Sequence, residues 1–242
     1  MPPRHPACPG ERCVSDDARR AQYAAVFDLL AEVYGRPVWR SHGPPLDELI
    51  YTILSQATAD VNTARAYAEL TARFPDWPSV MNAPPQAVSA AIRSAGLSNI
   101  KGPRIQNALR HVLHERGELS LDFLADLPLD EAQAWLTAIE GVGPKTAAIV
   151  LLFSLGRPTF PVDTHVHRVS LRLGLLPPRT NAVKAHTLLA ALGPPETYYA
   201  MHINLIRHGR ELCRARAPLC HICPLQDHCD YYRSTAVRAA DA

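Results

Sequence analysis

The sequence predicts an all-α protein, and two observations support this prediction. Apolar residues recur at spacings of three and four along most of the 242-residue chain, which is the period of helices with one buried face. No run of alternating apolar and polar residues bounded by hairpin turns indicates a β-strand. Hydrophobic residues make up 47% of the composition and charged residues 20%, so the chain has enough apolar side chains to build folded cores.

Five helices are predicted in the first half of the chain. They follow residues 1–17, which are rich in proline and charge and are expected to be disordered. The first helix ends at Gly35, and its buried face is predicted to carry Val26, Leu29, Leu30 and Val33. The same spacing predicts helices that begin near Leu46 and that span residues 61–74, 85–95 and 103–115.

Local capping signals place the helices of the second half. Asp130 and Gln133 have the spacing of a capping box for a helix that ends near residue 139. Asp163 is a good N-cap for a later helix, because a carboxylate accepts hydrogen bonds from first-turn N–H groups. The remaining helices are predicted over residues 181–192 and 197–213.

A tight hairpin is predicted between two of these helices. It consists of Gly141, Val142 and Gly143, and the two glycines let the backbone adopt positive φ and turn several N–H groups to one side. Pro144 opens the following helix, predicted through Phe153, whose positive dipole end favours a phosphate. The pattern indicates a helix-hairpin-helix that holds a DNA strand by its backbone. An ordinary helix–helix turn is the alternative.

Lys145 and Asp163 are the candidate catalytic residues. The chain has 22 arginines but only three lysines, and Lys145 lies one residue into the helix after the hairpin. An unprotonated lysine amine attacks an electrophilic carbon and forms a Schiff base, whereas arginine stays protonated. The Asp163 carboxylate is suited to accept the proton and to stabilise positive charge on a sugar ring. A phosphate-binding lysine and a purely structural N-cap are the alternatives.

Charge is segregated along the chain although the net charge is only +2. The charged residues within 101–116 are mostly basic, and those within 117–140 are all acidic. Residues 207–233 contain five arginines. Segregated charge is typical of a protein with one side that faces an anion. Ordinary surface variation is the alternative.

Four cysteines near the C-terminus follow the pattern C-x6-C-x2-C-x5-C: Cys213, Cys220, Cys223 and Cys229. Four thiolates in one short segment favour a soft-metal centre, and spacing alone does not separate zinc from iron–sulfur. Cys8 and Cys13 are interpreted as unbound. The first residues lack an apolar h-region and no apolar stretch is long enough to span a bilayer. We therefore expect no membrane partner and a cytosolic protein without a disulfide framework.

Two segments resemble the endonuclease III family. The family's helix-hairpin-helix and following aspartate are similar to LTAIEGVGPKTAAIVLLFSLGRPTFPVDTHVHRV. Its C-terminal [4Fe–4S] loop is similar, in the same cysteine spacing, to HGRELCRARAPLCHICPLQDHC. The resemblance covers about residues 20–233. It implies a DNA glycosylase with AP-lyase activity, acting on duplex DNA that contains oxidised pyrimidines or abasic sites.

The resemblance also implies a two-domain helix-hairpin-helix glycosylase fold with DNA bound across the cleft. Residues 37–157 would form a six-helix domain that contains the hairpin. Residues 18–36 and 158–233 would together form the domain of the iron–sulfur loop, and residues 234–242 a tail. We expect a monomer in a bacterial-type cytoplasm, associated with the nucleoid.

Carried over by position, the resemblance assigns Lys145 as nucleophile, Asp163 as essential carboxylate and the four cysteines as cluster ligands. Gln56 would enter the space left by a flipped base, and Leu97 would insert into the opposite strand. The other expected DNA contacts are Gly141, Val142, Gly143, Arg214 and Arg216. A polar helix end for Gln56 and a small satellite core for Leu97 are the alternatives.

Three departures from the family pattern leave other functions open. Gln56 falls one residue earlier than usual, Glu140 stands where proline is common, and Pro144 stands where a basic residue is common. A weakly active or divergent paralogue, acting mainly as an AP lyase or DNA-binding module, would fit these departures. An adenine mismatch glycosylase shares both motifs, but that family normally has serine at the Lys145 position and an additional C-terminal domain.

Overall fold

The structure, a computed structural model, describes residues 15–240, and within them every regular element is a helix. The predicted all-α class is confirmed. The buried side chains form two separate clusters, which we call the first core and the second core. Cys8 and Cys13 lie outside the described residues.

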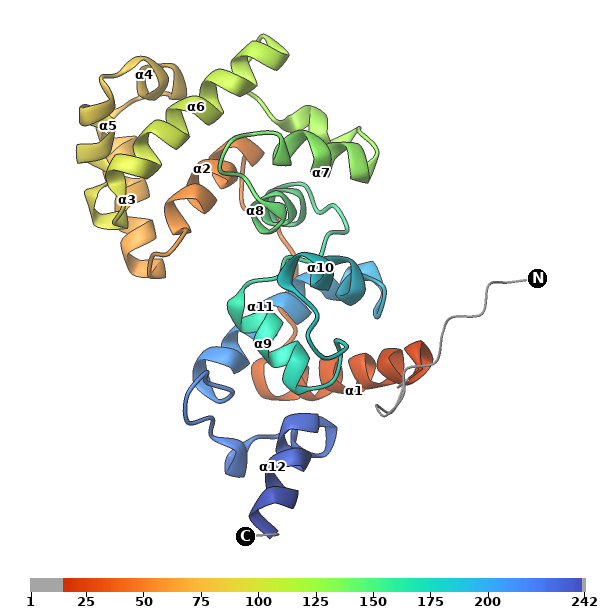
Figure 1. Cartoon of the computed structure of the whole chain (residues 1–242). Helices are drawn as coiled ribbons and strands as arrows, with labels where there is room; N and C mark the ends of the chain where they lie inside the picture. Colours follow the sequence, from red (N-terminus) through yellow and green to blue (C-terminus); the bar gives the residue numbers. More distant parts are fainter. Residues whose placement is uncertain (1–14, 241–242) are drawn as a thin grey trace.

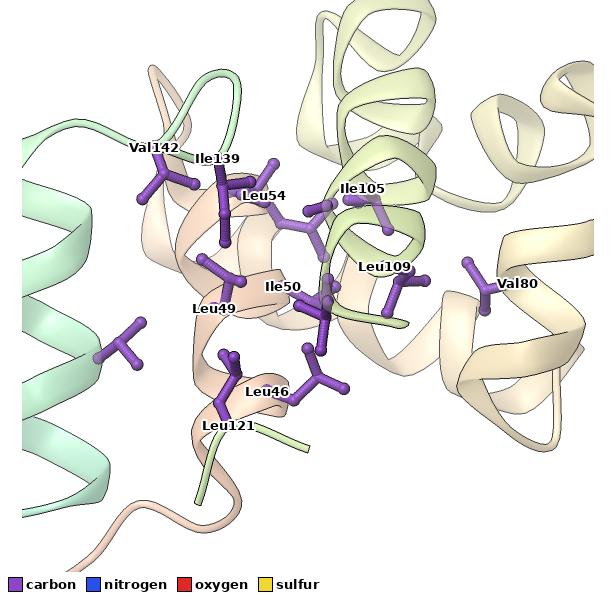
Figure 2. Close-up of a cluster of buried hydrophobic side chains, with 14 of the residues drawn as sticks. Leu46, Leu49, Ile50, Leu54, Val80, Ile105, Leu109, Leu121, Ile139 and Val142 are labelled. Atoms are coloured by element: carbon purple, nitrogen blue, oxygen red, sulfur yellow. The ribbon is translucent and has the colours of Figure 1, made fainter. Parts of the chain in front are cut away.

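The first core is built by seven helices and a π-helical segment. They are α2 (Pro45–Ser55), α3 (Asp60–Arg73), α4 (Trp77–Asn82), α5 (Pro85–Ala91), α6 (Ser98–Arg116), α7 (Leu129–Thr137), α8 (Pro144–Ile149) and η3 (Val150–Ser154). Figure 2 shows side chains from α2 at the centre of this core, between those of α6 and those of the hairpin after α7. Leu49, Ile50 and Leu54 are fully buried there.

The second core joins the two ends of the described chain. Its helices are α1 (Asp16–Tyr34), α9 (Thr164–Arg172), α10 (Ala182–Ala190), α11 (Tyr198–Glu211) and α12 (Asp230–Ala240). Figure 1 shows α1, from the start of the chain, beside α11 from its later part, and α11 in turn packs against α9. Val26 and Leu30 of α1 are fully buried, as predicted. Val33 is 47% exposed instead, because Tyr34 makes the contact with α11 in the last turn, through His208.

Several element boundaries differ from the predictions. Ser15 caps α1 through a 3.2 Å hydrogen bond from the Ala18 N–H, so residues 16 and 17 are helical rather than disordered. α6 begins at Ser98, five residues before Pro103. The proline is tolerated because the Asn99 carbonyl, which loses its helical partner, belongs to an exposed residue. Helix α12 also extends through most of the predicted tail.

Two further predictions fail around the hairpin. Asp130 does not cap α7, which begins at Leu129 after Pro128, so Asp130 lies within the first turn. The helix that opens at Pro144 is α-helical only to Ile149 and continues as the π-helix η3. A π-segment widens the turn by one residue, a change that a periodic apolar pattern does not reveal.

Candidate active site

The hairpin between α7 and α8 uses its two glycines differently. Gly141 adopts φ of +82°, and a Cβ there would lie 3.0 Å from Cδ of Arg104. Gly143 is extended, with φ of −95°, and caps α8, so of the two glycines only Gly141 adopts positive φ. Val142 is only 5% exposed and belongs to the first core. Its side chain anchors the hairpin, so the predicted DNA contact at Val142 is limited to its backbone.

Lys145 and Asp163 lie on the wall of one cleft between the two cores. Lys145 is exposed in the first turn of α8, directly after Pro144. Asp163 is the N-cap of α9, and its Oδ1 accepts a 2.7 Å hydrogen bond from the Val166 N–H. The cleft has a volume of about 560 Å³ and is lined by residues of α2, α8, η3 and α11 as well. An amine and an oriented carboxylate therefore face the same space.

His202 is a buried neighbour of this pair that the sequence did not single out. It lines the cleft, is 2% exposed, and its Nδ1 donates to the Pro161 carbonyl at 2.8 Å. The pKa of His202 is lowered to about 4, mainly by burial and to a smaller extent by Lys145, while Asp163 opposes the shift. The imidazole is therefore neutral near pH 7 and adds no positive charge beside Asp163.

An ion pair joins α3 to α11 beside the same cleft. The Arg210 guanidinium donates to both carboxylate oxygens of Asp60, at 2.7 and 3.2 Å. These hydrogen bonds hold the pKa of Asp60 below its usual value. Both residues line the cleft, and sequence reasoning missed them because 150 positions separate them.

Gln56 and Leu97 occupy two loops on the side of the first core. Gln56 follows α2, and its Nε2 donates to the Gly141 carbonyl at 3.2 Å, so the side chain contacts the hairpin. Leu97 precedes α6 with φ of +48° and is 58% exposed. An exposed leucine in a left-handed conformation is not a core residue, which excludes the satellite-core alternative for Leu97.

A buried lysine connects these two loops. The Lys101 Nζ donates to the Leu54 carbonyl at 2.7 Å, to the Thr58 hydroxyl at 2.6 Å and to the Ala95 carbonyl at 2.9 Å. Lys101 is 1% exposed, and burial lowers its pKa. All three ammonium protons are thus used in fixing the chain on either side of Gln56 and just before Leu97.

The four predicted cysteine ligands line one small cavity of the second core: Cys213, Cys220, Cys223 and Cys229. Within residues 15–240, no three His, Cys, Asp or Glu side chains are grouped to hold a single metal ion. A shared cavity suits a multi-iron cluster, which is ligated at separate corners. Burial and the neighbouring thiols raise the pKa of Cys223 to about 11, so thiolates at this site need a cationic centre to stabilise them.

Arginines from α9 hold the loop that carries the first cysteine. Arg168 Nε donates to the Cys213 carbonyl at 3.1 Å, and Arg172 Nη1 donates to the Arg214 carbonyl at 2.7 Å. The side chains of Arg214 and Arg216 are exposed beyond this loop. They are free to contact an anion, unlike the two arginines of α9.

The cleft combines an exposed amine with an oriented carboxylate, and the hairpin before Lys145 leaves first-turn N–H groups free. These features suit an enzyme whose amine attacks a sugar carbon in DNA. The class is that of helix-hairpin-helix DNA glycosylases. Residues 50–195 match the model of the HhH-GPD superfamily base excision DNA repair protein, and residues 213–229 match the iron-sulfur binding domain of endonuclease III.

The chain belongs to the endonuclease III family, a group of bifunctional DNA glycosylases with AP-lyase activity, and its cofactor is a [4Fe–4S] cluster. It is 33% identical to endonuclease III of Thermotoga maritima over 86% of this chain and 93% of that protein. It is 39% identical to the putative DNA glycosylase At3g47830 of Arabidopsis thaliana, over 68% of this chain but only 56% of that protein.

A solved structure shows the same fold. The structure of a trapped endonuclease III–DNA covalent intermediate superposes on this chain with a TM-score of 0.77 and 28% sequence identity. The match includes 90% of this chain and 98% of that chain. Among the residues that the structure describes, no helix is long and apolar enough to cross a membrane.

Proposed function

We propose that this chain removes oxidised pyrimidines from duplex DNA and cleaves the strand on the 3′ side of the abasic site. The observation that supports this most directly is that Lys145 and Asp163 line one cleft, although one belongs to a helix of the first core and the other caps a helix of the second core. The cleft, of about 560 Å³, has room for a nucleotide that has left the base stack.

Lys145 acts as the nucleophile. Its unprotonated Nζ forms a bond to C1′ of the sugar while the glycosidic bond breaks and the base leaves with the bonding electrons. The amine proton passes to the Asp163 carboxylate, and the sugar ring opens to give an imine. Loss of a 2′ proton then expels the 3′ oxygen with its phosphate, so the strand breaks by β-elimination.

Asp163 and its surroundings stabilise the charge that develops on the sugar. The Val166 N–H fixes the carboxylate at 2.7 Å, and the fully buried His202 adds no positive charge next to it. A negative charge that is already oriented requires little reorganisation when the sugar becomes cationic.

The duplex is held by groups around the cleft. Gly141, Val142 and Gly143 present backbone to one strand, and Arg214 and Arg216 contribute charge to phosphates. Gln56 enters the space left by the flipped base, and Leu97 inserts into the opposite strand. The protein is proposed to act as a monomer in the cytoplasm, associated with the nucleoid. The cluster organises the loop of residues 213–229 and takes no part in the steps above.

Borohydride trapping tests the proposal. Duplexes with a defined oxidised pyrimidine or an abasic site are incubated with the protein, and borohydride reduces any imine to a stable covalent adduct. We expect an adduct with both duplexes for wild type and for Lys184→Arg, an exposed lysine outside the cleft. Lys145→Arg should form none while still binding abasic DNA. An adduct with Lys145→Arg would disprove the assignment.

A further inference from the structure

A carboxyl on the α2 wall of the cleft has no role in the proposed chemistry. Glu48 lies in the first turn of α2, and its side chain is 10% exposed. It lines the same cleft as Lys145 and Asp163. Glu48 therefore shares this space with the groups that act on the sugar, and a flipped base would enter the same space.

The hydrogen-bonding capacity of Glu48 is poorly used within the protein. Its Oε1 accepts from the Thr52 hydroxyl at 3.3 Å, and its Oε2 lies 3.5 Å from Nδ1 of His42. Both distances exceed the usual range for such bonds. Its neighbour Asp47 differs, because the Trp77 Nε1–H donates to it at 2.8 Å. Burial raises the pKa of Glu48, and His42 opposes the shift.

The wall beside Glu48 is aromatic and is held in place by several contacts. The His42 ring stacks on Phe153 with centroids 4.8 Å apart and planes within 2°. The ring Nε2 of His42 lies 3.1 Å from the Tyr199 hydroxyl. The backbone N–H of His42 donates to the Phe153 carbonyl, also at 3.1 Å. A carboxyl next to a fixed aromatic wall is suited to bind a planar ring by its polar edge.

We propose that Glu48 is a specificity residue that accepts a hydrogen bond from an N–H group on the outer edge of the flipped base. This inference rests on the proposed function. When Lys145 and Asp163 hold the sugar, the base edge farthest from the glycosidic bond points away from them, into the rest of the cleft that Glu48 also lines. In pyrimidines this edge carries the N3–H of uracil- and thymine-type rings or the amine of cytosine-type rings. Among the oxidised pyrimidines of the proposed function, Glu48 would thus favour those that present a donor on this edge.

Two matched substrates test the proposal on the wild-type protein. Duplexes carry either 5,6-dihydrouracil or its N3-methyl derivative, which differ in one N–H group, and a third duplex carries an abasic site. The measured quantity is the rate of base excision divided by the rate of cleavage at the abasic site. We expect this ratio to be at least tenfold higher for dihydrouracil than for its methylated form. Equal ratios would overturn the proposal without any variant.

Variants then assign the effect to the carboxyl. Glu48→Leu should lower the ratio for dihydrouracil at least tenfold and remove most of the discrimination against the methylated base. Glu48→Gln keeps a carbonyl acceptor at the same place and should retain most of both the excision ratio and the discrimination. The control is Asp47→Asn, which leaves an acceptor for Trp77 and should match wild type in both measurements.

The other outcomes are separable. If Glu48→Leu lowers excision and abasic-site cleavage equally, Glu48 supports the scaffold and the proposal is overturned. If excision by Glu48→Leu is unchanged, the proposal is overturned as well. Absence of an imine adduct with abasic DNA in the wild type would instead disprove the proposed function itself.

Discussion

The Arg210 guanidinium and the Asp60 carboxylate form a two-pronged ion pair, 2.7 and 3.2 Å long, that joins α11 to the start of α3. Both residues line the cleft that also contains Lys145 and Asp163, so the pair is one direct contact there between a helix of the first core and a helix of the second. The pair therefore links the α3 and α11 walls of the cleft.

The first prediction concerns the strength of this pair. Its side chains are 50% and 69% exposed, so we expect a coupling energy of only about 0.2–1 kcal/mol in a double-mutant cycle of Asp60→Asn and Arg210→Gln. Because the pKa of Asp60 is lowered, this contribution is present above the unfolded value of 3.8 and is lost as the pH falls through the folded value. Denaturant unfolding at pH 7 and in acid checks it. A coupling of several kcal/mol would contradict it.

Asp163→Asn should separate folding from catalysis. The amide oxygen still accepts from the Val166 N–H, so the cap is kept and the melting temperature should stay within a few degrees of wild type. The charge that stabilises the cationic sugar is lost, so excision should fall by two or more orders of magnitude. Melting curves and single-turnover excision measure the two effects. Rapid excision by a stably folded Asp163→Asn would refute the role given to Asp163.

His202 predicts an acid sensitivity. Between pH 6.5 and about 4 the unfolded chain binds a proton at this residue that the folded chain does not, so stability falls as the pH falls through this window, by roughly 3 kcal/mol. His202→Asn keeps a donor for the Pro161 carbonyl and should reduce this dependence. His114→Asn, at a residue whose side chain is 84% exposed, should not. Denaturant unfolding at each pH provides the comparison.

The cysteine loop predicts an iron-containing protein. We expect a brown protein with about four irons per chain and absorption near 400 nm as rough values for such a cluster. Cys220→Ser should lower soluble yield more than it changes the chemistry of the remaining folded protein, because residues 213–229 lose the centre that organises them. Metal analysis that found one zinc and no iron would contradict this prediction.

Arg214 and Arg216 predict the salt dependence of DNA binding. Their side chains are exposed, and each should release about one counterion when it contacts a phosphate. Arg214→Ala and Arg216→Ala should each lower the slope of log K against log salt by about one. Arg19→Ala in α1, far along the chain from the hairpin, is a control that should leave it unchanged. Unaltered slopes in both test variants would place these arginines away from DNA.

The parts of the site that the sequence predicts are those set by local rules. Gly141 and Pro144 mark the hairpin because turns and first helical positions favour those residues, and Asp163 caps α9 as an isolated aspartate before a helix commonly does. Lys145 is a candidate because lysine is rare in a chain that has 22 arginines and only three lysines.

The parts that the sequence does not predict depend on contacts between distant segments. Asp60 meets Arg210 across 150 positions. Val142 is buried because α2 packs beneath the hairpin, although a valine between two glycines resembles an exposed turn residue. Lys101 resembles a solvent-facing lysine in its helix until the Leu54 and Ala95 carbonyls are placed around it.

That buried ammonium bears on how the protein would survey undamaged DNA. Lys101 ties the loop after α2 to the loop before α6, so Gln56 and Leu97 keep a fixed spacing before any duplex arrives. Side chains that are held on rigid loops lose little conformational entropy when they insert into DNA. The DNA, rather than the protein, must then change conformation. The protein would then dissociate quickly from stiff, well-stacked duplex, whereas a base step weakened by damage would deform and bind longer. Damaged and undamaged sites would thus differ in residence time before any bond is broken.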